Sequence, residues 1–333
     1  MTELVYDVVG IGNAIVDVLA RADDDFLQAQ KMNKGGMALI DEAQAASIYS
    51  SMGPAIEISG GSAANTIVGV ASFGARAAFI GKVRDDDLGH IFAHDIRAAK
   101  VAFETSPAKS GPSTARSYIL ITPDGERTMN TYLGAAQDLT PADIDEKTIA
   151  GAAITYLEGY LWDPPQAKEA FLKAARTAHG ANRRVALTLS DAFCVDRYRD
   201  EFLRLLRDGT IDLLFANESE LKSLYQTSDF DTAVSALRQD AKLAAVTRSE
   251  KGCVVVTEAA VEAVPAFPIS GIVDTTGAGD LFAAGFLFGL ARGASHVMAG
   301  RLGGLAAAEI IQHVGARPES SLKALAATNG LPV

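Results

Sequence analysis

The residues best placed to do chemistry lie in the run Asp274-Thr275-Thr276-Gly277-Ala278-Gly279-Asp280. A β-branched stretch precedes this run and the apolar segment 281–290 follows it, which predicts a turn that opens a helix. The first amides of a helix have no partners within it and carry partial positive charge, so they form a natural anion site. Asp280 places a carboxylate beside that site. It could cap the helix, or it could take a proton from a hydroxyl that attacks a phosphate.

Such residues need a fold that gathers distant loops at one edge. From about residue 151, apolar strand-like runs alternate with helical patterns. This alternation implies a parallel sheet with helices on both faces and ligands beyond the C-terminal ends of its strands. We expect strands at 4–10, 77–82, 153–157, 185–189, 213–216, 244–247 and 253–257, and helices at 62–73, 165–178, 198–207, 218–225 and 281–290.

A second, smaller sheet is predicted from a polar-edged hairpin. The stretch 115–122 is β-branched, and Asp124-Gly125 makes a turn before the strand 127–132. Such a hairpin fits poorly in a buried parallel sheet. We therefore assign a small separate sheet to segments near 13–20, 34–58 and 105–135, within a single domain that spans residues 1–333.

The composition limits the partners. The chain has 333 residues, 48% hydrophobic and 21% charged, with a net charge of −11, which argues against nucleic acid or an anionic membrane as a partner. Cys194 and Cys253 show no metal-type spacing and suit a reducing compartment. The N-terminus lacks a signal-peptide pattern, and the apolar run from Leu281 is too short to span a bilayer. We expect a cytoplasmic protein.

The run from Asp274 to Asp280, followed by Leu-Phe-Ala-Ala-Gly-Phe, resembles the C-terminal signature of the PfkB/ribokinase family of sugar and nucleoside kinases. The resemblance implies an α/β, ribokinase-like fold, with a central, mostly parallel sheet flanked by helices and a small β-sheet lid. It also implies ATP-dependent phosphoryl transfer to a hydroxyl, which needs positioning and charge stabilisation. Asp280 would be the general base, and the amides of Gly277, Ala278 and Gly279 would hold the transferred group.

Two N-terminal segments resemble the family's substrate-binding residues. In Gly12-Asn13-Ala14-Ile15-Val16-Asp17, the Asn13 amide and the Asp17 carboxylate suit a vicinal diol such as a ribose. In the run from Gly60 to Asn65, the resemblance implies that Gly60 and Gly61 approach the sugar and that Asn65 bonds a hydroxyl. The structural alternatives are a turn at Asn13, a solvated Asp17 and tight packing of a helix through small residues.

Gly10-Ile11-Gly12 also invites interpretation as a dinucleotide-binding loop. The third glycine of that pattern is missing, because position 15 is Ile, and no clear helix opens there. The sequence therefore disfavours an NAD-dependent dehydrogenase.

The resemblance places the nucleotide among later motifs. Asn217 and Glu220 match the family's Asn-x-x-Glu motif, which organises Mg²⁺ through water, although the pair alone also fits a helix cap. Thr247 and Gly252 bound a turn that resembles the nucleotide-binding turn, with Ser249 where the family usually has glycine. Further expected contacts are Thr276 and, in the turn 315–318 over the nucleotide base, Gly315; some members bind a monovalent cation, such as K⁺, between that turn and the Asp274 loop.

Arg127 lies on the predicted hairpin, at a place where family members carry an arginine that reaches the transferring phosphate when the lid closes. The alternative is a surface arginine beside Glu126. An exposed lid edge could also pair with a second copy, so both a monomer and a homodimer through the lid are compatible with the sequence.

The substrate is the least constrained feature. The segment 12–17 is more similar to adenosine kinases than to ribokinases or fructokinases, which predicts a ribonucleoside, with the 5′-hydroxyl of adenosine as the acceptor. A base needs an aromatic or apolar slot, for which Tyr160, Trp162 and Phe193 are candidates. The alternatives are a kinase for ribose, fructose or a related sugar, and a non-catalytic module that binds a nucleoside or sugar.

Overall fold

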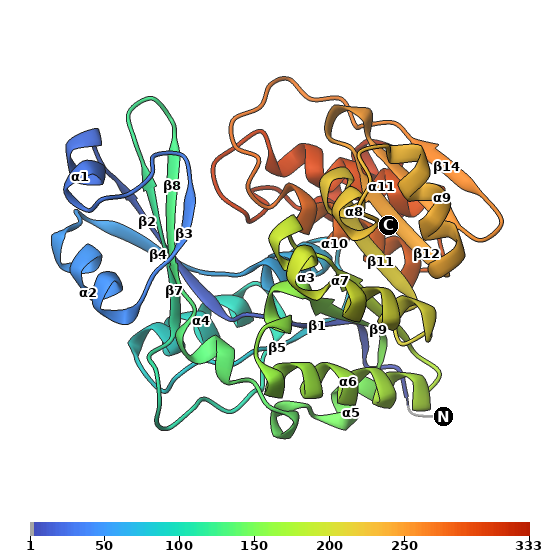
Figure 1. Cartoon of the computed structure of the whole chain (residues 1–333), viewed down its shortest axis with the longest axis horizontal. Coiled ribbons are helices and arrows are strands. Elements are labelled where there is room, and N and C mark those ends of the chain that lie inside the picture. The colour runs from blue at the N-terminus through green and yellow to red at the C-terminus, as the bar shows by residue number, and fades with distance from the viewer. Residues whose placement is uncertain (1–2) are drawn as a thin grey trace.

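The computed structural model describes residues 3–333 and contains two sheets (Figure 1). The larger sheet has the strand order β14-β13-β12-β11-β10-β9-β1-β5-β6. Neighbours pair in parallel from β12 to β6, and β13 and β14 add to one edge in antiparallel fashion. The predicted central, mostly parallel sheet is confirmed. Its strands are β1 (Tyr6–Ile11), β5 (Ala77–Ile80), β6 (Val101–Ala102), β9 (Ala152–Glu158), β10 (Arg184–Thr188), β11 (Leu213–Asn217), β12 (Leu243–Thr247), β13 (Cys253–Thr257) and β14 (Val261–Val264).

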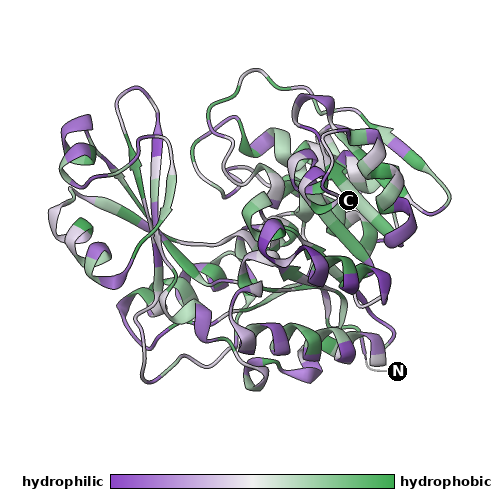
Figure 2. Ribbon diagram, in the orientation of Figure 1, coloured by the Kyte–Doolittle hydropathy of each residue, from purple (hydrophilic) through white to green (hydrophobic). Residues whose placement is uncertain are grey.

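Helices cover both faces of this sheet because successive residues of a strand point to opposite sides. In β1, Val8 belongs to one apolar core and Val9 to the other. Figure 2 shows the apolar residues gathered in the strands and in the helix faces turned toward them. The first core includes α3 (Ser62–Ser72), α4 (Asp87–Ala98), α10 (Ala278–Ala291), α11 (His296–Ile310) and α12 (Leu322–Thr328); the second includes α5 (Glu146–Ala150), α6 (Pro165–Gly180), α7 (Ala192–Arg207), α8 (Glu218–Leu224) and α9 (Phe230–Asp240).

The smaller sheet stands beside the main body, at the left of Figure 1, with the order β3-β8-β7-β2-β4. Its presence confirms the predicted second sheet. Its elements are β2 (Ile15–Arg21), β3 (Met37–Leu39), β4 (Ala55–Gly60), β7 (Ala115–Ile121) and β8 (Arg127–Tyr132), with α1 (Asp24–Ala29) and α2 (Glu42–Ser51) between strands.

Two local predictions need correction. The small-sheet segment expected near 13–20 is a strand only from Ile15, and because a strand rather than a helix follows β1, the Gly10-Gly12 stretch has no helix N-terminus to hold a pyrophosphate. The helix expected from Tyr198 begins at Ala192, because the Asp191 side chain accepts a hydrogen bond from Cys194 N (2.6 Å) and caps it. This helix bends at Tyr198 (φ −124°, ψ 20°).

Helices α3 and α10 pack closely, which sets the geometry of the site. A side chain at Gly69 would place its Cβ 2.6 Å from Ala284 Cβ, so only glycine permits this approach. The contact brings the first turns of both helices together. Within residues 3–333, no helix has the length and apolar character needed to cross a bilayer.

Candidate active site

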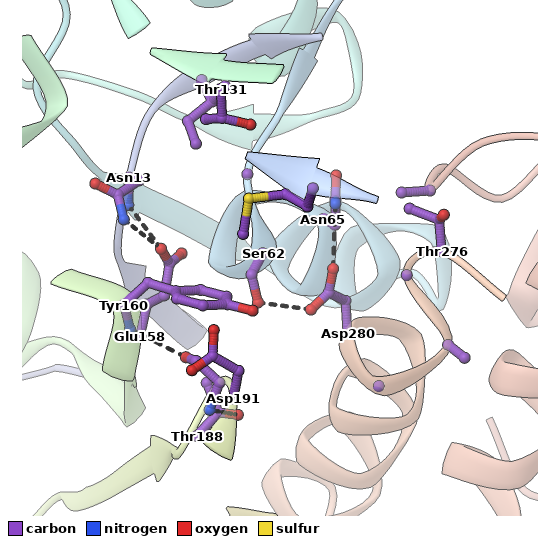
Figure 3. A pocket seen from close by; sticks show the side chains of 18 of the residues that line it. Asn13, Ser62, Asn65, Thr131, Glu158, Tyr160, Thr188, Asp191, Thr276 and Asp280 are labelled. Carbon is purple, nitrogen blue, oxygen red and sulfur yellow. Dashed lines mark hydrogen bonds between the residues drawn. The ribbon is translucent and has the colours of Figure 1, made fainter. Parts of the chain in front are cut away.

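A pocket of about 830 Å³ lies between the small sheet and the C-terminal ends of the central strands. Residues at the ends of β9, β10, β11 and β12 line one wall, and residues of β2, β3, β7 and β8 line the other. This is the edge at which open α/β sheets bind ligands. Figure 3 shows side chains that converge here from segments far apart in the sequence.

Asp280 lies in the first turn of α10 and receives two hydrogen bonds from α3. Ser62 Oγ donates to its Oδ1 (2.6 Å) and Asn65 Nδ2 donates to its Oδ2 (3.2 Å), as Figure 3 shows. Burial raises the pKa of the Asp280 carboxyl, and the bonds from Ser62 and Asn65 oppose that rise. The carboxylate is therefore held in a fixed orientation with raised basicity, which suits a group that removes a proton at neutral pH.

The loop before α10 is shaped by backbone geometry and by Asp274. Gly277 caps the helix in the left-handed conformation (φ +78°), which favours glycine. Asp274 accepts bonds from Thr276 N and Gly315 N, both at 3.0 Å, and pairs with the Arg127 guanidinium. The loop is thus fixed before any ligand arrives.

The amides of this loop differ in availability. Ala278 N donates to Thr275 O (3.2 Å), so the expected contribution of Ala278 to an anion site is already used within the turn. The amides of Gly279 and Asp280 follow in the first helical turn, where no intrahelical acceptor exists. A Cβ built at Gly279 would have no heavy atom within 4 Å, which leaves open space beside these amides for a phosphoryl group.

The opposite end of the pocket holds Asn13 and a buried acid that sequence reasoning missed. Asn13 Nδ2 donates to Glu158 Oε1 (2.7 Å), and Ala63 N donates to Glu158 Oε2 (2.8 Å). Burial raises the pKa of Glu158 to about 7, against bonds from Ala63 and Asn13 that lower it. Asp17, on β2, also lines the pocket, and burial raises the pKa of its carboxyl to about 6 despite the nearby Arg317.

Arg317 supplies positive charge behind these acids. Its guanidinium donates to Ser59 O (2.7 Å) and Ala64 O (2.9 Å), which fixes it against β4 and α3. Burial lowers its pKa to about 10, and Asp17, Asp95 and Asp280 oppose that change. One buried arginine therefore balances part of the charge of Asp17 and Asp280, two of the six acidic residues that line the pocket.

Asn217 and Glu220 form a complete helix cap at the start of α8. Asn217 N and Nδ2 donate to the Glu220 carboxylate (3.0 and 2.5 Å), and Glu220 N donates to Asn217 Oδ1 (2.8 Å). Both residues also line the pocket, and burial raises the pKa of Glu220 to about 7. Among residues 3–333, no group of three His, Cys, Asp or Glu side chains could hold a metal ion, so Mg²⁺ here would depend on water and phosphate ligands.

The pocket gathers most of the expected site residues. Those that line it are Asn13, Asp17, Gly61, Asn65, Asn217, Glu220, Thr247, Thr276, Gly277, Ala278, Gly279 and Asp280. The other four expected residues do not line the pocket, and each contacts another part of the chain. Gly60 packs against the Asp17 side chain, and Gly315 bonds Asp274. Gly252 (φ +80°) closes the turn against the chain at Val264, and Arg127 is held by Asp274.

Two of the three aromatic candidates line the pocket and the third does not. Tyr160 and Phe193 line the pocket, and Phe193 is 77% exposed at its mouth. Trp162 is 3% exposed and packs between Phe171 and Phe202 in the second core, so it cannot stack on a ligand in this pocket.

Three further polar residues of the site were not among the predicted ones. Glu158 has a visible signal, because a charged residue ends the apolar strand β9 and a glycine follows it. Ser62 sits in the same glycine-rich segment as Asn65, but its bond to Asp280 joins residues 218 positions apart. Arg317 shows no sequence signal beyond its place in the 315–318 turn.

Comparisons with known proteins agree with this geometry. The model of the pfkB family carbohydrate kinases matches residues 57–323. The adenosine kinase from Sinorhizobium meliloti is 55% identical, with 98% of this chain and 99% of that chain covered and a TM-score of 0.90. A probable sugar kinase protein from Rhizobium etli CFN 42 is 52% identical over 99% of this chain and 100% of that chain, with a TM-score of 0.92. Probable fructokinase-3 from Arabidopsis thaliana is 30% identical over 238 residues, 68% of each protein.

The family match spans the glycine-rich start of α3, the Asn217 motif and the Asp280 loop, which are the segments that build the pocket. The chain belongs to the pfkB family of carbohydrate kinases.

Proposed function

We propose that the chain transfers the γ-phosphoryl group of ATP to the 5′-hydroxyl of adenosine. One observation carries the proposal: a half-buried carboxylate, Asp280, lies beside open helix amides in a pocket that also has further polar groups and an apolar wall. The solved structures of an adenosine kinase and a probable sugar kinase, both more than half identical to this chain, support a kinase with a hydroxyl acceptor.

In this mechanism each residue has a physical role. Asp280 removes the proton from the attacking hydroxyl, and the amides of Gly277, Gly279 and Asp280 stabilise charge on the transferring group. Asn13, Asp17 and Asn65 orient the acceptor through its other hydroxyls. Bound Mg²⁺ supplies positive charge to the phosphates, and Asn217 and Glu220 would hold it through water. Thr247 and Thr276 line the phosphate side.

The apolar wall of the pocket favours a nucleoside over a free sugar. The small sheet turns Ile15, Met37, Leu39, Ile119 and Met129 toward the pocket. A bare sugar would leave this wall in contact with water, whereas a purine base would cover it.

Replacing Leu39 by Ser should therefore raise the KM for adenosine about tenfold, because burial of a leucine against a ligand contributes about 1.5–3 kcal/mol when complete. The kcat at saturation should change little, since the base contact is made equally in the ground and transition states. Leu39 is 62% exposed, so the fold should tolerate the change.

Ile56→Ser is the matched control, because Ile56 is an equally exposed apolar residue of the small sheet that does not line the pocket. An unchanged KM for adenosine in Leu39→Ser would show that the base does not contact this wall.

We propose that residues 1–333 form one kinase domain in which the small sheet is a lid. Arg127, on β8, pairs with Asp274 in the loop before α10 and so joins the lid to the phosphate side of the pocket. Burial lowers the pKa of Arg127, and Asp17 opposes this change. A closed lid would keep water from the phosphoryl group. A monovalent cation at Asp274, such as K⁺, would have to compete with the Arg127 guanidinium.

The buried carboxylates predict that stability and activity respond to pH with opposite signs. The pKa values of Asp17, Glu158 and Glu220 rise from 3.8, 4.5 and 4.5 to about 6, 7 and 7 on folding. Between about pH 4.5 and 7 the folded state thus binds more protons than the unfolded chain, so these groups add stability as the pH falls. Activity should fall over the same range, because Asp17 and Glu158 serve the acceptor as carboxylates.

We expect a higher midpoint of thermal unfolding at pH 6 than at pH 8, together with a lower kcat/KM. Two carboxylates whose pKa values are lowered to about 2, Asp124 and Glu218, oppose the stability trend only at lower pH. Melting curves and initial rates in the same buffers would measure both quantities. Parallel pH trends would contradict the assignment of these acids to the substrate side.

The substrate is tested by ADP release with Mg-ATP across adenosine, inosine, guanosine, ribose, fructose and 2-keto-3-deoxygluconate. Turnover of adenosine alone supports the proposal. Turnover of a free sugar keeps the mechanism and replaces the acceptor by a sugar, an alternative favoured by the similarity to probable fructokinase-3. Binding without turnover on any acceptor would favour a non-catalytic module. We further propose a cytoplasmic location, since both cysteines are free and buried.

A further inference from the structure

Two asparagines of the pocket carry amide oxygens without partners. Asn13 Oδ1 and Asn65 Oδ1 are both buried, and neither accepts a hydrogen bond within the protein. Both residues line the pocket. Buried polar atoms are nearly always paired, so two unpaired acceptors in one pocket point to a ligand with hydroxyl donors.

The orientation of each amide is forced by a carboxylate. At a pH above its pKa a carboxylate only accepts hydrogen bonds, so an amide that faces it must then present its NH₂ group. Asn13 Nδ2 donates to Glu158 Oε1 (2.7 Å), and Asn65 Nδ2 donates to Asp280 Oδ2 (3.2 Å). Figure 3 shows both amide nitrogens directed at these acids and the Asn13 oxygen directed away.

We propose that Glu158 is a positioning residue that fixes Asn13 as a hydrogen-bond acceptor and thereby selects an acceptor substrate with a hydroxyl at that place. The inference rests on the proposed function, since it assumes that a ribose-like diol occupies this end of the pocket. Glu158 and Asn13 both line the pocket, but both Glu158 oxygens already accept hydrogen bonds, from Asn13 Nδ2 and from Ala63 N, so Glu158 acts through Asn13.

Glu158 also has a structural contact that the test must separate from this role. Ala63 N donates to Glu158 Oε2 (2.8 Å), which holds the first turn of α3. Asn13 N also donates to Glu158 Oε1 (3.3 Å), so Glu158→Gln removes one of two acceptor oxygens that face three N–H groups. When the Gln oxygen keeps the Ala63 bond, its NH₂ group faces Asn13. The Asn13 amide should then turn over and present NH₂ groups to the substrate, which leaves the hydroxyl without its acceptor.

The test compares wild type, Glu158→Gln, Asn13→Asp and the double variant. Calorimetry would give the Kd for adenosine, 2′-deoxyadenosine and 3′-deoxyadenosine. Glu158→Gln should weaken adenosine binding by about 10- to 100-fold, the range for an unpaired buried polar group. At least one of the two deoxy analogues should bind Glu158→Gln almost as tightly as it binds the wild type. Asn13→Asp should also weaken adenosine binding, because two carboxylates then face each other.

The double variant should recover most of the adenosine affinity and the preference over the deoxy analogue. The Gln NH₂ group can donate to one Asp oxygen and leave the other as the acceptor. The proposal would be overturned if the double variant bound adenosine no more tightly than the weaker-binding single variant. It would also be overturned if Glu158→Gln kept the wild-type preference for adenosine over the deoxy analogues. If Glu158→Gln does not fold, Asn13→Ala, which leaves the Ala63 bond intact, must lose the same preference or the proposal fails.

Glu169→Gln, an exposed glutamate on α6, controls for the loss of a carboxylate. Turnover of adenosine by the wild type tests the proposed function separately. If the wild type phosphorylates a free sugar instead, the same variants with that sugar and its deoxy form decide the proposal.

Discussion

Asp280→Asn should lower kcat by about 10²–10⁴-fold, the usual contribution of a positioned general base. The substitution keeps the size of the side chain, and its amide oxygen can still accept one of the bonds from Ser62 and Asn65. The protein should therefore remain folded and bind adenosine, while the step that removes the hydroxyl proton is lost. Single-turnover rates with Mg-ATP, together with a melting curve, would measure the two effects.

Asp231→Asn is the matched control for this experiment. Asp231 also occupies the first turn of a helix, α9, but it is exposed and lies outside the pocket. It should behave as wild type. Near-normal turnover by Asp280→Asn would show that the Asp280 carboxylate only caps α10 and that another group takes the proton.

The sequence could predict the parts of the site that depend on local chemistry. Gly277 is needed where the chain turns with positive φ into an apolar helix, and Asn217 and Glu220 have the spacing of a helix cap. Each of these two signals involves residues that are only a few positions apart in the sequence. The alternation of strands and helices predicted the large sheet for the same reason, since the burial of each strand can be inferred from its own apolar residues.

The remaining parts depend on contacts between distant segments. Ser62 and Asp280 meet only because α3 and α10 pack at Gly69, which no local pattern reports. Trp162 was a candidate for the pocket by residue type, yet it fills the core, because a strand end does not reveal which way the next turn points. Arg127 was expected at a phosphate, and its pairing with Asp274 depends on how the small sheet stands over the loop.

The pocket must hold an anionic nucleotide although it is rich in acids. Asp17, Glu158 and Asp280 all line it, and the chain as a whole carries a net charge of −11. In the proposed mechanism, Asp17 and Glu158 lie toward the acceptor, and the open amides of α10 lie toward the phosphates. Local dipoles, rather than net charge, would therefore bind the nucleotide, since helix amides act within the first turn.

Gly279→Ala tests that conclusion, and its effects on stability and activity should have opposite signs. The added methyl group would meet no atom of another segment within 4 Å, and Gly279 has no positive φ, so the fold has room for it. Alanine in a helix is favoured over glycine by up to about 1 kcal/mol, so the midpoint of unfolding should stay constant or rise. The methyl group would occupy the space through which a phosphoryl group reaches the amides. The kcat/KM for ATP should fall about 10²-fold, comparable to the loss of one oxyanion donor.

The matched control is Gly180→Ala, in the last turn of α6, where a Cβ also meets nothing within 4 Å and which lies outside the pocket. It should leave kcat/KM unchanged. Calorimetry with adenosine alone should show normal affinity in Gly279→Ala, because the acceptor's hydroxyls meet Asn13, Asp17 and Asn65 instead. If Gly279→Ala keeps its kcat/KM for ATP, the phosphoryl group does not approach these amides. If adenosine affinity falls as far as kcat/KM, the methyl group disturbs the whole pocket, and the amides lose their separate role.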